Sequence, residues 1–162
     1  MSQTIPRSSG YSYDYPHFAL TVDAVLFSKS EEGLNVLLIR RAHEPFKDRW
    51  AFPGGFVNID EVIDHAVYRE LKEETSISNV SLKRFDIFDA IERDPRERTV
   101  SVVYYGFING SKQSLEAGDD AGDAKWFPIN KLPELAFDHS IILKKIWEEI
   151  KDSIFPASTS AE

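Results

Sequence analysis

The stretch that most constrains this chain is residues 51–77, AFPGGFVNIDEVIDHAVYRELKEETSI. It begins like a strand, is interrupted by a proline and two glycines, and continues with apolar residues at helical spacing. Proline removes a backbone donor and glycine tolerates turn conformations, so the strand should end at this point. We expect the helix to run from about residue 61 to residue 75, with Asp60 as its N-cap.

The expected core-facing side of this helix changes from apolar to acidic along its length. At about 100° per residue, Ile63, Ala66 and Val67 fall on one side of the helix. The same stripe continues with three acidic residues, Glu70, Glu73 and Glu74. Like charges this close repel each other unless something neutralises them. The pattern therefore places carboxylates where a soluble protein normally has core side chains.

Two interpretations fit this pattern. In the first, the segment is an ordinary surface helix with i,i+4 ion pairs, for which Arg69 and Glu73 have the right spacing. In the second, the carboxylates form a cluster for a hard divalent cation, Mg²⁺ or Mn²⁺, because these ions prefer oxygen ligands. The first does not explain why the acidic residues share a face with the apolar ones. The pattern alone leaves both open.

Composition narrows the class of protein. A chain of 162 residues fits one compact domain, and the absence of cysteine excludes disulfides, zinc–thiolate sites and cysteine nucleophiles. The formal net charge of −8 argues against nucleic-acid binding by this chain alone, so an anionic ligand would need a metal ion or a local arginine cluster. There is no secretory-signal pattern and no bilayer-length apolar stretch, so we expect a cytoplasmic protein without membrane contact.

The rest of the chain contains further strand-like and helical segments. The predicted strands are residues 18–27, 34–40, 82–91, 98–108 and 124–129, with a short strand within residues 49–57 that Pro53 and the glycines terminate. The first two should form a hairpin, and a closing helix is predicted at residues 138–154. This order predicts one α/β or α+β domain over residues 17–153, with helices packed on a mixed sheet. Residues 1–16 are expected to form a flexible arm, and residues 154–162 a tail or the start of a linker.

The residues from Gly55 onward follow a long, fixed spacing. Five residues separate Gly55 from Glu61, and seven more precede the run Arg69-Glu70-Leu71-Lys72-Glu73-Glu74-Thr75-Ser76-Ile77. This resembles the Nudix box, the loop–helix signature of hydrolases that cleave a nucleoside diphosphate linked to another group. The resemblance implies the Nudix fold, a mixed sheet sandwiched between helices with a loop–helix–loop catalytic motif. The box has glycine where this chain has Ser76, just past the helix, where a left-handed residue is common.

The resemblance also implies roles for the residues of the box. Glu70 and Glu74 would be the main ligands of a divalent metal, with Glu73 assisting. Arg69 would orient the glutamates, and the carbonyl oxygen of Gly55 would add a ligand. The structural members of the box would be Gly55, Glu61, Leu71 and Ile77, with Glu61 holding the loop to the helix. Such metal ions neutralise a pyrophosphate, orient it and lower the pKa of the attacking water.

Several segments outside the box carry a second resemblance. They are YPHFALTVDAVLF, LLIRRAHEPFKDRWAFPGGFV, RDPRERTVSV, AGDDAGDAKWFP and LPELAFDH, which together cover most of residues 15–140. They resemble the ADP-ribose pyrophosphatase branch, which implies AMP and ribose 5-phosphate as products.

Two alternatives stay open. The same segments resemble the ADP-ribose-sensing domain of Nudix-related transcriptional regulators of NAD metabolism, which carry a winged-helix DNA-binding domain behind it and hydrolyse weakly or not at all. Another nucleoside diphosphate, such as a sugar nucleotide or an oxidised nucleotide, is a further possible substrate. Some relatives exchange an amino-terminal arm between subunits, so a homodimer is also considered.

Further candidate ligand contacts lie outside the core of the box. Guanidinium groups suit phosphate oxygens, and the candidates are Arg40, Arg41, Arg96 and Arg98. Candidates to stack on adenine are Trp50, Phe56 and Tyr105, although aromatic residues in strands are more often core residues. His139 is a candidate ligand contact. Asp119 or Asp120 is a candidate general base, against the alternative that both belong to a polar turn.

Overall fold

The computed structural model describes residues 13–30, 33–108 and 121–154. These residues form seven strands and two helices. In chain order the elements are β1 (Ala19–Ser30), β2 (Gly33–Arg41), β3 (Trp50–Ala51), β4 (Gly54–Phe56), α1 (Ile63–Thr75), β5 (Leu82–Phe88), β6 (Thr99–Ile108), β7 (Ala121–Pro128) and α2 (His139–Ile154). The predicted arm and tail fall largely outside the described residues, so they and the exchange of the arm between subunits stay predictions.

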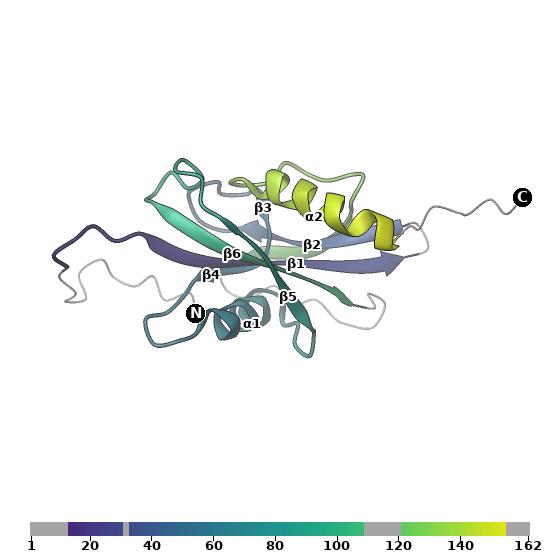
Figure 1. The fold of residues 1–162 in the computed structure, drawn as a ribbon. Helices are drawn as coiled ribbons and strands as arrows, with labels where there is room; N and C mark the ends of the chain where they lie inside the picture. The colour runs from purple at the N-terminus through teal and green to yellow at the C-terminus, as the bar shows by residue number, and fades with distance from the viewer. Residues whose placement is uncertain (1–12, 31–32, 109–120, 155–162) are drawn as a thin grey trace, which may run out of the picture.

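The strands form one mixed sheet with a helix on each face (Figure 1). The strand order is β3-β2-β1-β6-β5, with β4 paired to β1 and β7 paired to β2. β1 and β6 run parallel, whereas the other pairs are antiparallel. The predicted mixed sheet between helices is therefore confirmed. Within the described residues, neither helix is long and apolar enough to cross a membrane.

β1 and β2 form the predicted hairpin but pair only near its turn. Their pairing extends from Ser30 and Gly33 to Phe27 and Val36. Beyond this point β4 takes the edge of β1, and β3 takes the edge of β2. The segment from β3 to β4 therefore fills the space that opens between the two long strands.

The prediction of a short strand that ends at Pro53 was correct but incomplete: β3 ends before Pro53, and a second short strand, β4, follows it. Proline has no backbone N–H to donate to a sheet ladder. The Pro53 carbonyl instead accepts a hydrogen bond from the backbone N–H of Ala24 at 2.8 Å. The contact with β1 then continues along β4, whose glycines lie against the carboxylates of α1.

The predicted start of the first helix was wrong. α1 begins at Ile63, and Val62 occupies the N-cap position without a side-chain capping bond, while Asp60 lies exposed in the preceding loop. The side chain of Glu61 accepts a hydrogen bond from the backbone N–H of Asn58 at 2.8 Å. This bond belongs to the loop, so the helix starts after it. The predicted end at residue 75 is confirmed.

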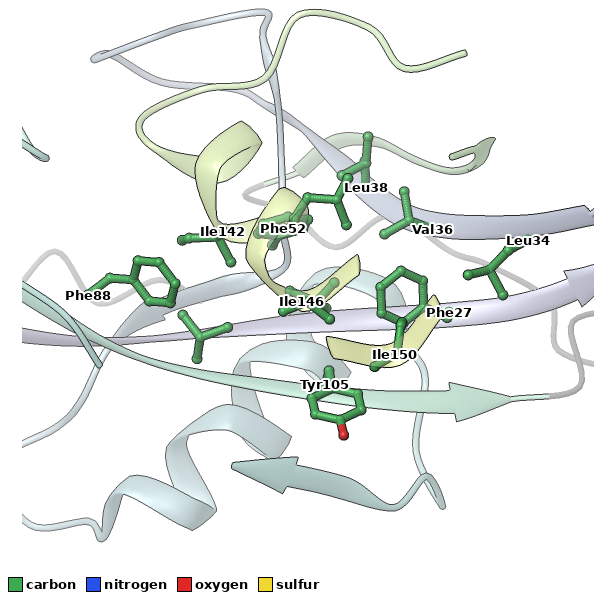
Figure 2. Close-up of a cluster of buried hydrophobic side chains, with 13 residues drawn as sticks. Phe27, Leu34, Val36, Leu38, Phe52, Phe88, Tyr105, Ile142, Ile146 and Ile150 are labelled. Carbon is green, nitrogen blue, oxygen red and sulfur yellow. The ribbon is translucent and has the colours of Figure 1, made fainter. Parts of the chain in front are cut away.

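Two apolar layers hold the helices to the sheet. On one face, α2 inserts Ile142, Ile146 and Ile150 against β1 and β2, as Figure 2 shows. On the other face, Ala66, Val67 and Leu71 of α1 are fully buried. Burying a large aliphatic side chain contributes about 1.5–3 kcal/mol. These layers therefore hold α1 in the position in which its acidic residues contact β4.

Ser76 takes the left-handed conformation that the glycine of the box would supply. Its φ is 60° and its ψ is 6°, and its backbone N–H donates to the carbonyl oxygen of Lys72 at 2.9 Å. The C-terminal end of α1 therefore keeps its capping geometry in spite of the substitution. This conformation is unfavourable for serine, because it brings the Ser76 Cβ atom too close to the carbonyl oxygen that follows it.

Replacing Ser76 by Gly should raise the free energy of unfolding by about 1 kcal/mol, because glycine adopts this conformation without the Cβ contact. Urea denaturation followed by circular dichroism measures the change. Ser78→Gly is a matched control, since Ser78 is exposed and is not among the residues with positive φ. An equal gain in both variants would contradict the explanation.

Candidate active site

The backbone of β4 lies directly against the carboxylates of α1. The N–H of Gly54 donates a hydrogen bond to Glu74 Oε2 at 2.9 Å. A Cβ atom on Gly55 would lie 2.6 Å from the carboxylate carbon of Glu70. A Cβ atom on Gly54 would lie 2.2 Å from the carbonyl oxygen of Val22. Close approach, rather than a special turn, therefore requires glycine at both positions.

Glu70 and Glu74 point inward, whereas Glu73 lies nearer the surface. The side chain of Glu70 is 13% exposed and that of Glu73 is 36% exposed. Burial, helped by the negative charges of Glu70 and Asp23, raises the pKa of Glu74 to about 8. Burial also raises the pKa of Glu70. The helix thus presents two inward-facing carboxyl groups that resist ionisation.

Arg69 connects the loop, the helix and the carboxylates. Its Nε donates to Glu61 at 2.9 Å, and its Nη2 donates to the carbonyl oxygen of Phe56 at 3.0 Å. Its Nη1 donates to Glu70 at 2.6 Å and to Glu73 at 3.2 Å. The hydrogen bonds from Arg69 lower the pKa of Glu61. Arg69 and Glu61 therefore join the loop to the helix.

The donor chemistry of this cluster fits a hard divalent cation. Glu70, Glu73, Glu74 and Gly55 offer only oxygen donors, which Mg²⁺ and Mn²⁺ prefer. A carboxylate with a raised pKa, as at Glu74, is held ionised at neutral pH by a nearby cation. Among the described residues, no three acidic or imidazole side chains converge into a ready-made metal site. Arg69 bonds to one oxygen of Glu70, Oε1, which leaves the other oxygen available to a cation.

The glycines of β4 and the three glutamates of α1 line a cleft of about 1990 Å³. Guanidinium groups line the same cleft. Arg41 Cζ lies 4.8 Å and Arg96 Cζ lies 5.7 Å from the centroid of the Phe137 ring. Arg96 also lies over the Phe56 ring, at 5.1 Å. Burial, together with the positive charge of Arg96, lowers the pKa of Arg41. An anion that contacts both guanidinium groups would relieve their mutual repulsion.

The predicted substrate contacts separate into two groups. Those that line the cleft are Arg41, Phe56, Arg96 and His139. Those that do not are Arg40, Trp50, Arg98 and Tyr105. Trp50 packs edge-on against Phe127, with 4.6 Å between ring centroids, and Tyr105 belongs to the core beneath α2. Arg40 and Arg98 are exposed elsewhere, while Asp119 and Asp120 lie outside the described residues.

The prediction from sequence missed a buried polar network at the floor of the cleft. Arg93 makes a two-point ion pair with Asp138, at 2.8 and 3.0 Å. Asp23 lies 3.8 Å from Arg93 and 3.6 Å from the His139 ring. His139 Nδ1 accepts a hydrogen bond from the Phe52 backbone N–H at 3.0 Å. An aspartate inside the apolar segment TVDAV indicates such a network, because a buried charge requires partners.

A mixed sheet between two helices, with a glycine loop set against inward-facing glutamates, defines the class of the protein. The model of the NUDIX domain matches residues 17–147, and the chain belongs to this family. Two relatives within the family are similar to the chain in sequence. An ADP-ribose pyrophosphatase of Methanocaldococcus jannaschii is 41% identical over 130 residues, covering 80% of this chain and 73% of the relative. The ADPR-responsive transcriptional repressor NtrR of Acinetobacter baylyi is 32% identical over 145 residues, covering 86% of this chain and 57% of the repressor.

Solved structures agree with this placement. A MutT/nudix family protein from Enterococcus faecalis superposes with a TM-score of 0.78 at 35% identity, covering 88% of this chain and 65% of that protein. The NUDIX domain of Shewanella oneidensis NrtR, solved in complex with ADP ribose, also has a TM-score of 0.78, at 31% identity. That match covers 87% of this chain and 94% of the solved domain.

The two glycines of β4 should respond differently to substitution by alanine. Gly54→Ala places Cβ against rigid backbone and should lower the free energy of unfolding by about 1–3 kcal/mol. For Gly55→Ala the nearest atoms are the movable end of Glu70, so it should be less destabilising but should weaken Mn²⁺ binding by about tenfold. Urea denaturation and Mn²⁺ titration followed by electron paramagnetic resonance measure the two effects. The reverse pattern would contradict the geometry.

His139 should make the protein less stable in mild acid. Burial lowers the pKa of His139, and Arg93 and Arg41 oppose its protonation, although Asp23 and Asp138 favour it. Below about pH 6.5 the unfolded chain binds a proton that the folded protein excludes, so this histidine costs stability as the pH falls.

The test compares the wild type with His139→Asn, whose side-chain oxygen can still accept from the Phe52 N–H. Between pH 7.5 and 5.5, the wild type should lose about 1 kcal/mol of unfolding free energy relative to the variant. Urea denaturation at both pH values isolates this difference from the other titrating groups. A pH-independent difference would show that His139 is protonated normally.

Proposed function

We propose that this chain binds ADP-ribose and, with a divalent metal ion, Mg²⁺ or Mn²⁺, hydrolyses its pyrophosphate to AMP and ribose 5-phosphate. The observation that supports this most is the complete acidic set of the box on an undistorted helix. Glu70, Glu73 and Glu74 are all present, and Ser76 does not displace the end of α1. The similarity to an ADP-ribose pyrophosphatase supports the choice of substrate.

Glu70, Glu73, Glu74 and the Gly55 carbonyl would hold the cation, which would neutralise the pyrophosphate and lower the pKa of the attacking water. In the reaction, the water oxygen bonds to one phosphorus and the bridging P–O bond breaks, so AMP and ribose 5-phosphate separate. Arg69 keeps the carboxylates oriented through its bonds to Glu70 and Glu73.

The arginines of the cleft have a separate task. Arg41 and Arg96 line the cleft that contains the glutamates. Guanidinium groups bind phosphate oxygens in a fixed geometry. They would therefore hold the pyrophosphate and stabilise the charge that develops on the departing phosphate. This division lets an acidic protein bind a dianion, because positive charge is concentrated at one place.

A second candidate function is an ADP-ribose sensor. The same fold binds ADP ribose in the Shewanella oneidensis NrtR domain, and the chain is 32% identical to a repressor of which it spans 57%. In this function the cleft would bind ADP-ribose with little turnover. One experiment separates the two: ADP-ribose and Mg²⁺ are mixed with the protein and followed by phosphorus NMR, with calorimetric binding in parallel. Formation of AMP at enzyme-like rates supports the hydrolase, and binding without cleavage supports the sensor.

Glu74→Gln should reduce kcat for ADP-ribose by about 100-fold or more, because it removes a charged metal ligand. Binding of ADP-ribose without metal, measured by calorimetry, should stay within about threefold of the wild type, which shows that the cleft is intact. Glu73→Gln is the matched control and should lose less activity, since Glu73 is the more exposed carboxylate. Full activity in Glu74→Gln would refute the metal assignment.

A further inference from the structure

Phe137 is a bulky residue in a left-handed backbone conformation at the wall of the cleft. Its φ is 52°, and its half-buried side chain lines the same cleft as the glutamates. For a residue with a Cβ atom this conformation costs about 1–2 kcal/mol. It persists only where the surrounding structure imposes it, and such positions cluster at ligand sites.

Buried contacts on both sides impose this conformation. Ala136, which precedes Phe137, is fully buried and donates from its backbone N–H to the carbonyl oxygen of Trp50 at 2.7 Å. Asp138, which follows it, makes the two-point ion pair with Arg93, whose side chain is only 4% exposed. The backbone of Phe137 is thus held between a sheet-like bond and a buried ion pair.

Two of the guanidinium groups that line the cleft lie over the Phe137 ring. Arg41 and Arg96 both approach it, at 4.8 and 5.7 Å from the ring centroid. Asp94 holds the far side of Arg96 through bonds of 3.0 and 2.7 Å, and the Pro45 carbonyl accepts from Arg41 Nε at 2.7 Å. Each guanidinium is therefore fixed at one edge by its own loop and lies over the shared ring, and Arg96 also lies over the Phe56 ring, at 5.1 Å.

Two cations on one aromatic ring favour a ligand with more than one negative group. Like charges held together are unfavourable by themselves, and the ring face offsets only part of this repulsion. A pyrophosphate presents two adjacent anionic groups, so it can pair with both guanidinium groups at once. A ligand with a single anionic group gains from only one of them.

We propose that Phe137 is a positioning residue of the substrate site, whose ring holds Arg41 and Arg96 as a preformed pair for a pyrophosphate. The buried pair of Arg93 and Asp138 holds Phe137 in the backbone conformation that this requires. The inference rests on the proposed function for its substrate. It goes further in assigning recognition of the pyrophosphate to a strained aromatic residue that does not itself touch the reacting atoms.

The test uses Phe137→Leu, which keeps an apolar side chain and the same backbone strain but removes the ring. The dissociation constants of ADP-ribose and of inorganic pyrophosphate, measured by calorimetry in EDTA, should both rise by about tenfold, the equivalent of two weak cation–π contacts. With Mg²⁺, the KM for ADP-ribose should rise by a similar factor, while kcat stays within about twofold. Phe137→Tyr keeps the ring and should behave like the wild type.

Two further variants separate positioning from general stability. Phe46→Leu is the matched control, because the Phe46 ring packs edge-on with the Phe137 ring, with 4.8 Å between the ring centroids, but belongs to a different loop. This variant should leave the KM nearly unchanged. Asp138→Asn should raise the KM as Phe137→Leu does. The double variant Phe137→Leu/Asp138→Asn should be no worse than Phe137→Leu, since Asp138 acts through the ring.

The outcomes distinguish this inference from the proposed function. If the wild type cleaves ADP-ribose and Phe137→Leu changes only stability, or lowers kcat at constant KM, the inference is wrong and the proposed function stands. If the wild type ignores ADP-ribose but binds pyrophosphate in a Phe137-dependent way, the inference stands and the proposed function is wrong. If the wild type binds neither anion, both are wrong.

Discussion

The contact between the β4 backbone and the carboxylates of α1 is the constraint on which the rest of the structure depends. Glycine at position 54 lets β4 lie close to β1, and glycine at position 55 lets it lie close to Glu70 of the helix. In this position the backbone N–H of Gly54 donates a hydrogen bond to Glu74. β4 fits in the space where β1 and β2 separate. The apolar side chains that pack around Leu71 fix the position of α1 over the sheet. Arg69 then joins loop, helix and glutamates into one unit.

The cleft solves an electrostatic difficulty that follows from the composition. A chain with a net charge of −8 must bind a dianionic pyrophosphate if the proposed function is right. Positive charge is concentrated locally in the structure, because Arg41 and Arg96 lie over one aromatic ring. This ring belongs to the cleft that the glutamates also line. In the proposed function, the acidic and basic groups would have different partners, because carboxylates suit a cation and guanidinium groups suit phosphate oxygens.

Ser76 does not separate the hydrolase from the sensor. The residue adopts the left-handed conformation expected of glycine, and the last turn of α1 keeps its capping bond. Its effect is therefore confined to local backbone strain and does not reach the carboxylates.

Some features followed from the sequence itself. Periodicity and spacing indicated the mixed sheet, the end of α1 and the inward-facing glutamates, because apolar period and glycine placement are local properties. Local patterns did not show that a second strand, β4, follows Pro53, that the helix starts only after Val62, or that Trp50 and Tyr105 are packed away from the cleft. Each depends on which segments meet across the sheet. The same reason applies to Asp23, Arg93, Asp138 and Phe137, whose partners are distant in the chain, so only the tertiary structure decided their roles.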